Sequence, residues 1–211
     1  MAYFTKKNLS RIIWQYVRSV LYNYYVALFY NHNFLYCLKT NVVGSWKHIP
    51  YSWYHSRCYI DVEEYLKSGS DDKERHKWHD MDKIIMFILF PWLGPDCIND
   101  IHTLTQSHHL YYWTDGKKWK KSWWAIDWDQ AVVDWECARF TKPDKPLDAY
   151  DTLMKYYYED PKFFRSAIDA MIDLGLYYDK YTDIGRTVGK TKVMNNFLEC
   201  YPKWKNFVKY F

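Results

Sequence analysis

Apolar residues recur at three- and four-residue intervals along most of the chain, which is the spacing of amphipathic helices. The first such stretch runs from Leu9 to about Tyr30, and Ser10 is a suitable cap for its start. Its apolar face is rich in aromatic side chains. We therefore expect this helix to be buried in the core or against a partner chain, an arrangement that would also suit a homodimer.

A change of pattern follows between Asn41 and Pro50, where Gly44 and Pro50 interrupt the apolar spacing. Since glycine and proline punctuate regular structure, this stretch is expected to be a connector. The helical spacing returns over Tyr51–Lys67, and Gly69 fits the end of that helix.

A third helix is expected from about Asp72 to Phe90, because acidic residues at its start suit a helix N-terminus and an apolar run completes it. Pro91 then ends it. On this interpretation His79 and Asp80 lie near the middle of the helix, and Lys83 shares a helical face with His79.

The second half of the chain continues the helical pattern. Asp96 to Trp113 is expected to be helical in its first half, and Thr114 to Trp124 to be a polar loop. Further helices are expected over Ile126–Phe140, Leu147–Tyr158, Pro161–Leu176 and about Thr191–Phe211. The sequence thus predicts an all-α fold in a single domain over residues 1–211, with a core at 51–140, a C-terminal helical part at 141–211 and aromatic-rich extensions at both ends.

Composition narrows the setting. Aromatic residues make up 21% of the chain, and the net charge of +4 is compatible with an anionic ligand without requiring nucleic acid. The five cysteines form no Cys-x-x-Cys pair, which favours a reduced, cytoplasmic setting. No signal peptide is recognised, and asparagines interrupt the apolar run from Val20 to Leu38, so no membrane span is expected.

Histidines and aspartates provide the candidate chemistry. Three of the eight histidines lie within the eight residues from His102 to His109. His102 and His109 are seven positions apart, so two turns of one helix would place them on the same face. Helices packed in a bundle can direct such residues into a shared site. Nitrogen and oxygen ligands suit iron, manganese, magnesium or zinc, and the set exceeds what one ion needs, so two ions are expected. The ordered candidates are His55, His79, Asp80, His102, His108, His109 and Asp134.

This order resembles the HD superfamily of metal-dependent phosphohydrolases, whose signature is His…His-Asp…Asp. It is closer still to a family of uncharacterised phage and bacterial HD-like proteins. In those, His-Asp-x-x-Lys precedes a His-x5-His-His-x-x-Tyr-Trp segment and a later helix with an aspartate. The matching stretches here are His79–Lys83, His102–Trp113 and Val133–Trp135, so the resemblance covers about Tyr51 to Phe140.

The resemblance implies roles for individual residues. His79, Asp80 and Asp134 match the superfamily core, with Asp80 as the natural bridge between two metals. His102 and one or both of His108 and His109 match the additional ligands of the two-metal branches. His55 fits by its place in the preceding helix, and His76 is a less suitable rival. Lys83 would neutralise phosphate charge, helped by Arg57 or Arg139, and Lys117 and Lys118 would attract an anionic substrate.

The expected function is hydrolysis of a nucleotide or another small phosphate ester. Two alternatives remain: an HD-type di-iron oxygenase, and a non-catalytic binding protein that keeps the fold. The lysines and tryptophans of 114–124 could receive a phosphate or stack a base, but a solvated loop packed by its tryptophans is the expectation. Gly185–Thr191 resembles a phosphate-binding loop, yet it has three residues between its glycines where that motif has four.

Overall fold

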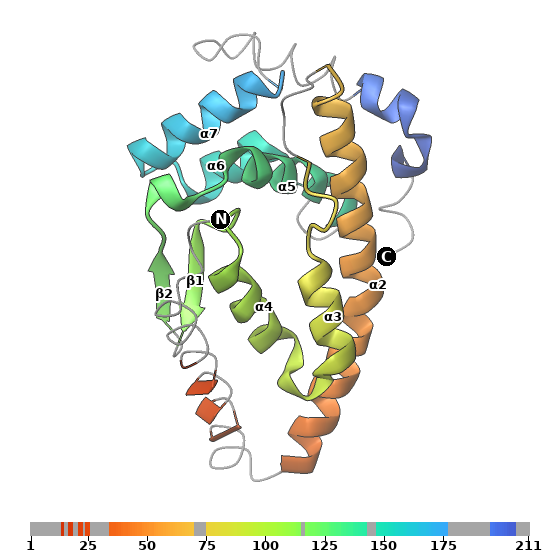
Figure 1. Ribbon diagram of the computed structural model, residues 1–211, viewed down its shortest axis with the longest axis vertical. Coiled ribbons are helices and arrows are strands. Elements are labelled where there is room, and N and C mark those ends of the chain that lie inside the picture. Colours follow the sequence, from red (N-terminus) through yellow and green to blue (C-terminus); the bar gives the residue numbers. More distant parts are fainter. Residues whose placement is uncertain are drawn as a thin grey trace. The chain divides into compact units, whose positions relative to one another are not determined.

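The computed structural model describes residues 14, 17–18, 21–22, 24–25, 34–69, 75–114, 117–142, 147–176 and 195–205 (Figure 1). The fold is all-α, as predicted. The described residues also contain one small β-hairpin, which was not predicted. The described residues divide into two compact units. The first unit combines the chain up to Trp53 with Asp80–Ala125, and the second combines Tyr54–His79 with the chain from Ile126 onward.

Some predicted elements lie outside the described residues. They are most of the helix expected from Leu9 to Tyr30, the segment Gly185–Thr191 and both ends of the last expected helix. Of that last helix, residues 195–200 are described and helical.

The first unit contains the hairpin. α4 packs against both α3 and strand β1. Its core includes Phe87, Leu93, Cys97 and Ile98, all buried. The elements are the first part of α2 (Phe34–Leu66), α3 (Met81–Leu89), η1 (Pro91–Leu93), α4 (Gly94–Thr105), β1 (Tyr111–Thr114), β2 (Lys117–Lys120) and η2 (Trp123–Ala125).

The connector expected between Asn41 and Pro50 is wrong, because α2 runs through it without a break and includes Pro50. The polar residues that suggested a loop bind a neighbouring turn. Asn41 Nδ2 donates to the carbonyl of Trp92 at 3.1 Å, and Ser45 Oγ donates to that of Pro91 at 2.9 Å. These side chains satisfy backbone groups at a turn that has few partners of its own.

The polar loop expected from Thr114 to Trp124 is also wrong, because strands β1 and β2 pair there in antiparallel register, with Tyr112 opposite Trp119. Aromatic residues favour strands, and the Asp-Gly pair between the two strands is a hairpin sequence. The three lysines of β2 made this stretch resemble a polar loop.

The third helix begins later than expected. Residues 77–80 form a turn, and α3 starts at Met81 with Asp80 as its N-cap in the left-handed region at φ 59°. A non-glycine residue in that region is uncommon, and here the Asp80 side chain is held by the contacts described below. His79 therefore precedes the helix and does not share a helical face with Lys83. Pro91 ends the helix as expected.

The second unit is a set of packed helices, and α5 packs against both α6 and α7. Asp127, Asp148 and Asp160 cap the three helices by accepting hydrogen bonds from backbone N–H groups. The elements are the last part of α2, α5 (Trp128–Thr141), α6 (Ala149–Tyr156), α7 (Pro161–Asp173) and η3 (Pro202–Lys205), which confirm the helices expected from 126 to 176.

No single helix among the described residues has the length and apolar character needed to cross a membrane. One pair of described helical segments, α3 and Pro91–Thr105, reaches the required length and hydropathy when the two are taken together. The chain bends by 92° between them.

Candidate metal centres

All seven predicted metal ligands are described, and within each unit they come together. In the first unit we call Asp80, His102, His108 and His109 the Asp80 group. In the second unit we call His55, His79 and Asp134 the His79 group. All members of the two groups are buried except His109, which is half-buried.

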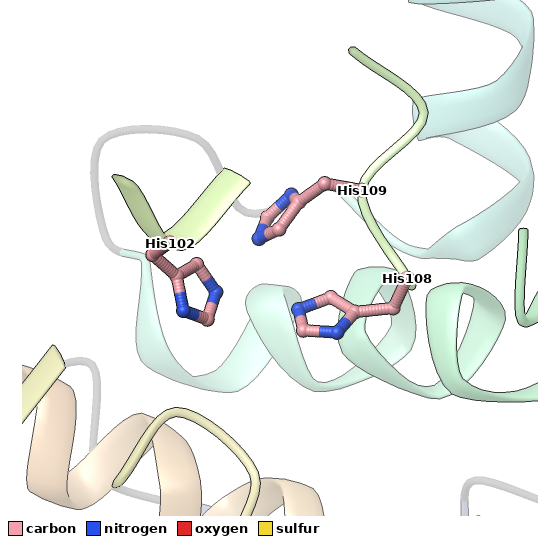
Figure 2. A group of neighbouring side chains, drawn as sticks. All are labelled: His102, His108 and His109. Atoms are coloured by element: carbon pink, nitrogen blue, oxygen red, sulfur yellow. The ribbon is translucent and has the colours of Figure 1, made fainter. Parts of the chain in front are cut away.

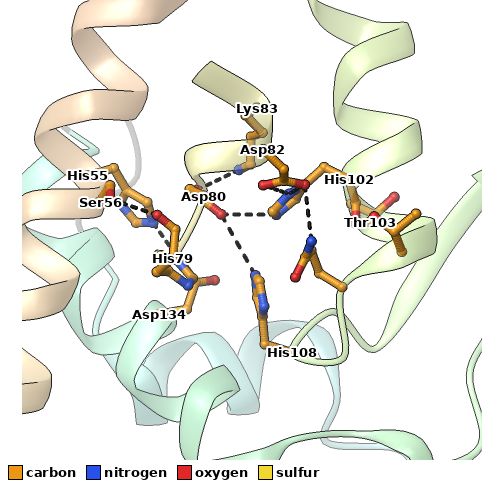
Figure 3. A network of polar contacts seen from close by, with 12 residues as sticks. His55, Ser56, His79, Asp80, Asp82, Lys83, His102, Thr103, His108 and Asp134 are labelled. Carbon is orange, nitrogen blue, oxygen red and sulfur yellow. Dashed lines mark hydrogen bonds and ion pairs between the residues drawn. The ribbon is translucent and has the colours of Figure 1, made fainter. Parts of the chain in front are cut away.

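The carboxylate of Asp80 is the centre of the first group (Figure 3). Its Oδ1 lies 3.0 Å from His102 Nε2 and 3.9 Å from His108 Nε2. Its other oxygen, Oδ2, lies 2.7 Å from Lys83 Nζ. Asp80 thus has nitrogen atoms on one side and a cationic side chain on the other.

The three histidines of this group face one another (Figure 2). Ring centroids of His102 and His109 are 4.8 Å apart, and those of His108 and His109 are 4.3 Å apart. One nitrogen from each ring lies within 4.8 Å of the others, a spacing that one ion can span. His102 and His109 do not share a helix as expected, since α4 ends at Thr105 and a turn carries the later pair back.

Hydrogen bonding fixes the tautomer of His102. Its Nδ1 lies 2.8 Å from Asp82 Oδ2, and Gln106 Nε2 donates to the same oxygen at 3.1 Å. Because a carboxylate only accepts, Nδ1 carries a proton, and in the neutral ring Nε2 therefore has the lone pair. Burial raises the pKa of Asp82, but the hydrogen bond from His102 and the positive charges of His102 and Lys83 together outweigh burial and leave that pKa lowered.

The lone pair on His102 Nε2 points toward another electron-rich atom. Nε2 is buried with no hydrogen-bond partner among the described residues, yet lies 3.0 Å from Asp80 Oδ1. Two ligand atoms that share one cation at about 2.1 Å are about 3.0 to 3.4 Å apart. The contact has this spacing, and Asp82 behind His102 is the carboxylate that commonly orients a metal-bound histidine.

In the second unit, Asp134 on α5 is the centre of the His79 group. Its Oδ1 lies 2.7 Å from His55 Nε2 and 3.4 Å from His79 Nε2. The Asp134 side chain therefore does not face outward but is buried, with a histidine at each of these contacts. Burial raises the pKa of Asp134, but hydrogen bonds from His55 and His79 outweigh it, so the pKa falls well below its usual value.

The tautomer of His55 follows from a chain of donors. Thr141 Oγ1 donates its one proton to the carbonyl of Cys137 at 3.1 Å, so it accepts from His55 Nδ1 at 2.8 Å. His55 Nε2 then faces Asp134 either with a second proton, as an imidazolium, or with its lone pair toward a cation. Both states place positive charge beside this buried carboxylate.

The neighbours of His79 hold its backbone and its ring. Ser56 Oγ donates to the His79 carbonyl at 2.6 Å, and the Gln130 side-chain amide lies 3.3 Å from His79 Nδ1. The oxygen and nitrogen of the Gln130 amide can be exchanged by a flip of the side chain. With the oxygen toward His79, Nδ1 carries the ring proton and Nε2 can bind a metal.

Several supporting residues were missed by sequence reasoning. Asp82, Gln130 and Thr141 orient histidines from behind, and no sequence motif marks them. Cys137 lies with Sγ 3.7 Å from His55 Nδ1, and one ligand atom each from His55, Asp134 and Cys137 lie within 4.8 Å of one another. Burial raises the pKa of the Cys137 thiol well above its usual value, which favours a protonated neighbour over a thiolate ligand.

Of the predicted phosphate-binding residues, only Lys83 contacts a candidate ligand. Arg139 is paired with Glu136, Nη1 to Oε1 at 2.8 Å. Arg57 is exposed on α2, and Lys117 and Lys118 are exposed on β2.

His76, the rival ligand, belongs to a separate buried cluster of charges in the second unit. Its Nδ1 lies 2.7 Å from Glu63 Oε1, and its Nε2 lies 3.2 Å from Asp127 Oδ2. Lys67 Nζ also lies 3.0 Å from Glu63 Oε1. Burial lowers the pKa of His76, but the hydrogen bonds that its ring donates to Asp127 and Glu63, together with the negative charge of both carboxylates, outweigh burial and raise the pKa to about 9. His76 is thus a cation between two carboxylates and offers no lone pair to a metal.

Comparison of the chain with protein-family models, with curated proteins and with solved structures found no match. The resemblance to the HD superfamily therefore depends on the motif residues alone and stays a prediction.

Proposed function

We propose that the protein is a metal-dependent phosphohydrolase that acts on a nucleotide or another small phosphate ester, with one divalent cation in each group. The observation that carries the proposal is the contact of His102 Nε2 with Asp80 Oδ1 at 3.0 Å, with the ring proton held on the far side by Asp82. Buried electron-rich atoms at this distance repel one another unless a proton or a metal cation lies between them. His102 Nε2 makes no hydrogen bond to a described residue, which supports the metal cation.

The donor atoms decide which cations fit. The Asp80 group offers three imidazoles and a carboxylate, and the His79 group offers two imidazoles and a carboxylate. This mixture suits iron, manganese or zinc better than magnesium, which prefers oxygen ligands. A bound cation of this kind supplies Lewis acidity toward a phosphoryl oxygen and lowers the pKa of a bound water.

The residues of the chain have their own tasks in this proposal. Asp82 keeps a proton of His102 on Nδ1, and Thr141 does the same for His55, so that each Nε2 is the nitrogen that would bind a cation. Lys83 keeps Asp80 ionised through their contact at 2.7 Å. It is also the cationic side chain best placed to bind a phosphate oxygen at the Asp80 group.

The proposal includes a reduced, intracellular setting. It is supported by the five cysteines, which are all free, three of them buried. In an oxidising compartment, unpaired cysteines would tend to form disulfides.

The test is metal analysis of protein purified without chelator, combined with a phosphate-release screen over nucleotides. The double substitution His79→Ala and Asp80→Ala is expected to abolish metal retention and phosphate release while the helical circular dichroism signal stays largely intact. His48→Ala is the control, because His48 Nδ1 is bound to the Gly44 carbonyl at 2.8 Å and belongs to neither group.

Two other results would replace the proposal. Iron with oxygen-dependent turnover would assign the protein to the oxygenase alternative. Absence of metal together with inactivity toward every nucleotide would assign it to the non-catalytic binding proteins.

A further inference from the structure

The β1–β2 hairpin exposes aromatic and basic side chains together. Trp113 is 46% exposed and Trp119 48% exposed, and Trp124, just beyond β2, is 73% exposed. The expectation that the tryptophans of this segment pack it from within is therefore wrong. Large aromatic rings left in water at this extent commonly mark a binding surface.

The strand register sorts these side chains onto two faces. Tyr111 lies opposite Lys120 and Trp113 lies opposite Lys118, so these four share one face. Lys118 Nζ lies over the Tyr111 ring, 4.0 Å from its centroid.

Tyr112 lies opposite Trp119 on the other face of the hairpin. Lys117 is on that face too, because it alternates with Lys118 along β2. Each face thus carries at least one exposed tryptophan and at least one exposed lysine.

The hairpin has a firm base. The Lys121 backbone N–H donates to the Leu110 carbonyl at 2.9 Å, which closes the hairpin one step beyond the strands. Lys121 Nζ donates to the carbonyls of Thr103 and Gln106 at the C-terminal end of α4. This lysine anchors the hairpin to α4, while the three lysines of β2 stay exposed.

We propose that this hairpin is a binding site for single-stranded nucleic acid, with a base stacked on Trp113 and a phosphate held by Lys118 on one face, and a base stacked on Trp119 and a phosphate held by Lys117 on the other. Base stacking on exposed aromatics combined with nearby cations is how proteins hold single strands without reading their sequence. Four lysines and one aspartate fall between Leu110 and Trp124, so the charge matches a polyanion. The site requires neither metal group, and it holds whether or not the protein is a hydrolase.

The same side chains fit a membrane surface less well. Binding at a lipid interface needs one face that is free of charge and rich in apolar residues. Both faces of this hairpin carry lysine, and its two strands contain no leucine, isoleucine, valine or phenylalanine.

The test is fluorescence anisotropy of the full chain with labelled oligothymidine and oligouridine, in EDTA so that no metal-dependent cleavage occurs. The double substitution Trp113→Ala and Trp119→Ala is expected to weaken binding of both strands about tenfold or more, because each stacked base contributes substantially to affinity. Trp46→Ala is the matched control, since Trp46 is 57% exposed on α2 and should leave affinity unchanged.

Two further measurements separate stacking from charge. Lys117→Gln with Lys118→Gln should reduce the slope of log affinity against log salt by about one to two. A duplex of the same length should bind more weakly than the single strand, because its bases are already stacked. Equal affinity for the duplex, unchanged affinity of the tryptophan variant, or adsorption to anionic vesicles in place of oligonucleotides would each overturn the proposal.

Discussion

The ring of Tyr59 stacks on the imidazole of His79, with centroids 3.7 Å apart and planes inclined by 10°. The Tyr59 hydroxyl donates to Glu63 Oε1 at 3.3 Å, and the side chain is fully buried. Burial raises the pKa of this phenol, so it stays a neutral donor. A flat, anchored ring thus restricts the orientation of one candidate metal ligand.

This stacking gives a prediction for two substitutions at one position. Tyr59→Phe keeps the ring and loses one weak hydrogen bond, so metal retention by the His79 group should change little. Tyr59→Leu removes the flat surface and lets His79 rotate, which should lower metal affinity about tenfold, as for other supports of metal ligands. Calorimetric metal titration measures both variants. Equal loss in the two variants would assign the role to the hydroxyl instead of the ring.

Asp82 gives a matching prediction in the first unit. Asp82→Ala removes the acceptor of the His102 Nδ1 proton, so the neutral ring can place its proton on Nε2 and cease to be a ligand. Metal affinity should fall about 10- to 100-fold, and Asp82→Asn, which keeps an oxygen, should lose less. Asp96→Asn is the control, because Asp96 is an exposed residue in the first turn of α4. A loss for Asp96→Asn as large as for Asp82→Ala would point to general destabilisation.

The sequence predicted which histidines and aspartates come together better than it predicted the elements that carry them. Histidine and aspartate are uncommon enough in apolar helices that their order alone selects candidates. The left-handed backbone at Asp80 cannot be read from spacing, because only contacts made after folding hold an aspartate there. Likewise, Asn41 and Ser45 suggest a loop until their tertiary partners are known.

The same limit applies to the residues that support the ligands. Asp82, Gln130 and Thr141 are ordinary polar residues in the sequence, and only proximity to a histidine gives them a role. Proximity of this kind joins positions such as 55 and 141, which local patterns do not relate.

Gly94 gives a stability prediction. Its φ is +81°, and a Cβ there would lie 2.7 Å from Asn41 Oδ1. Gly94→Ala should therefore lower the free energy of unfolding by about 3 kcal/mol, from backbone strain and collision together. Gly175→Ala is a matched control, because its φ is +72° and nothing lies within 4 Å of the added atom. Urea unfolding compares the two variants, and an equal effect would mean that the contact with Asn41 relaxes without strain.

His76 gives a prediction for the pH dependence of stability. Its pKa is raised from 6.5 to about 9 in the folded protein by Asp127 and Glu63. The folded state therefore binds the proton more tightly than the unfolded state does. The resulting stability is fully present below pH 6.5 and is lost as the pH rises to about 9. The shift would correspond to about 3.5 kcal/mol at about 1.4 kcal/mol per pKa unit. Because the His76 ring is only partly buried and solvent screens its ion pairs, the expected loss is on the order of 2 kcal/mol.

Urea unfolding at several pH values measures this loss. His76→Gln should be less stable than the original chain at pH 6 and should show a flatter pH profile, because glutamine does not titrate. Lys67 remains beside Glu63 in the variant, so that carboxylate keeps one cationic partner and the fold should survive. An unchanged pH profile in His76→Gln would mean that another group is responsible for the loss at alkaline pH.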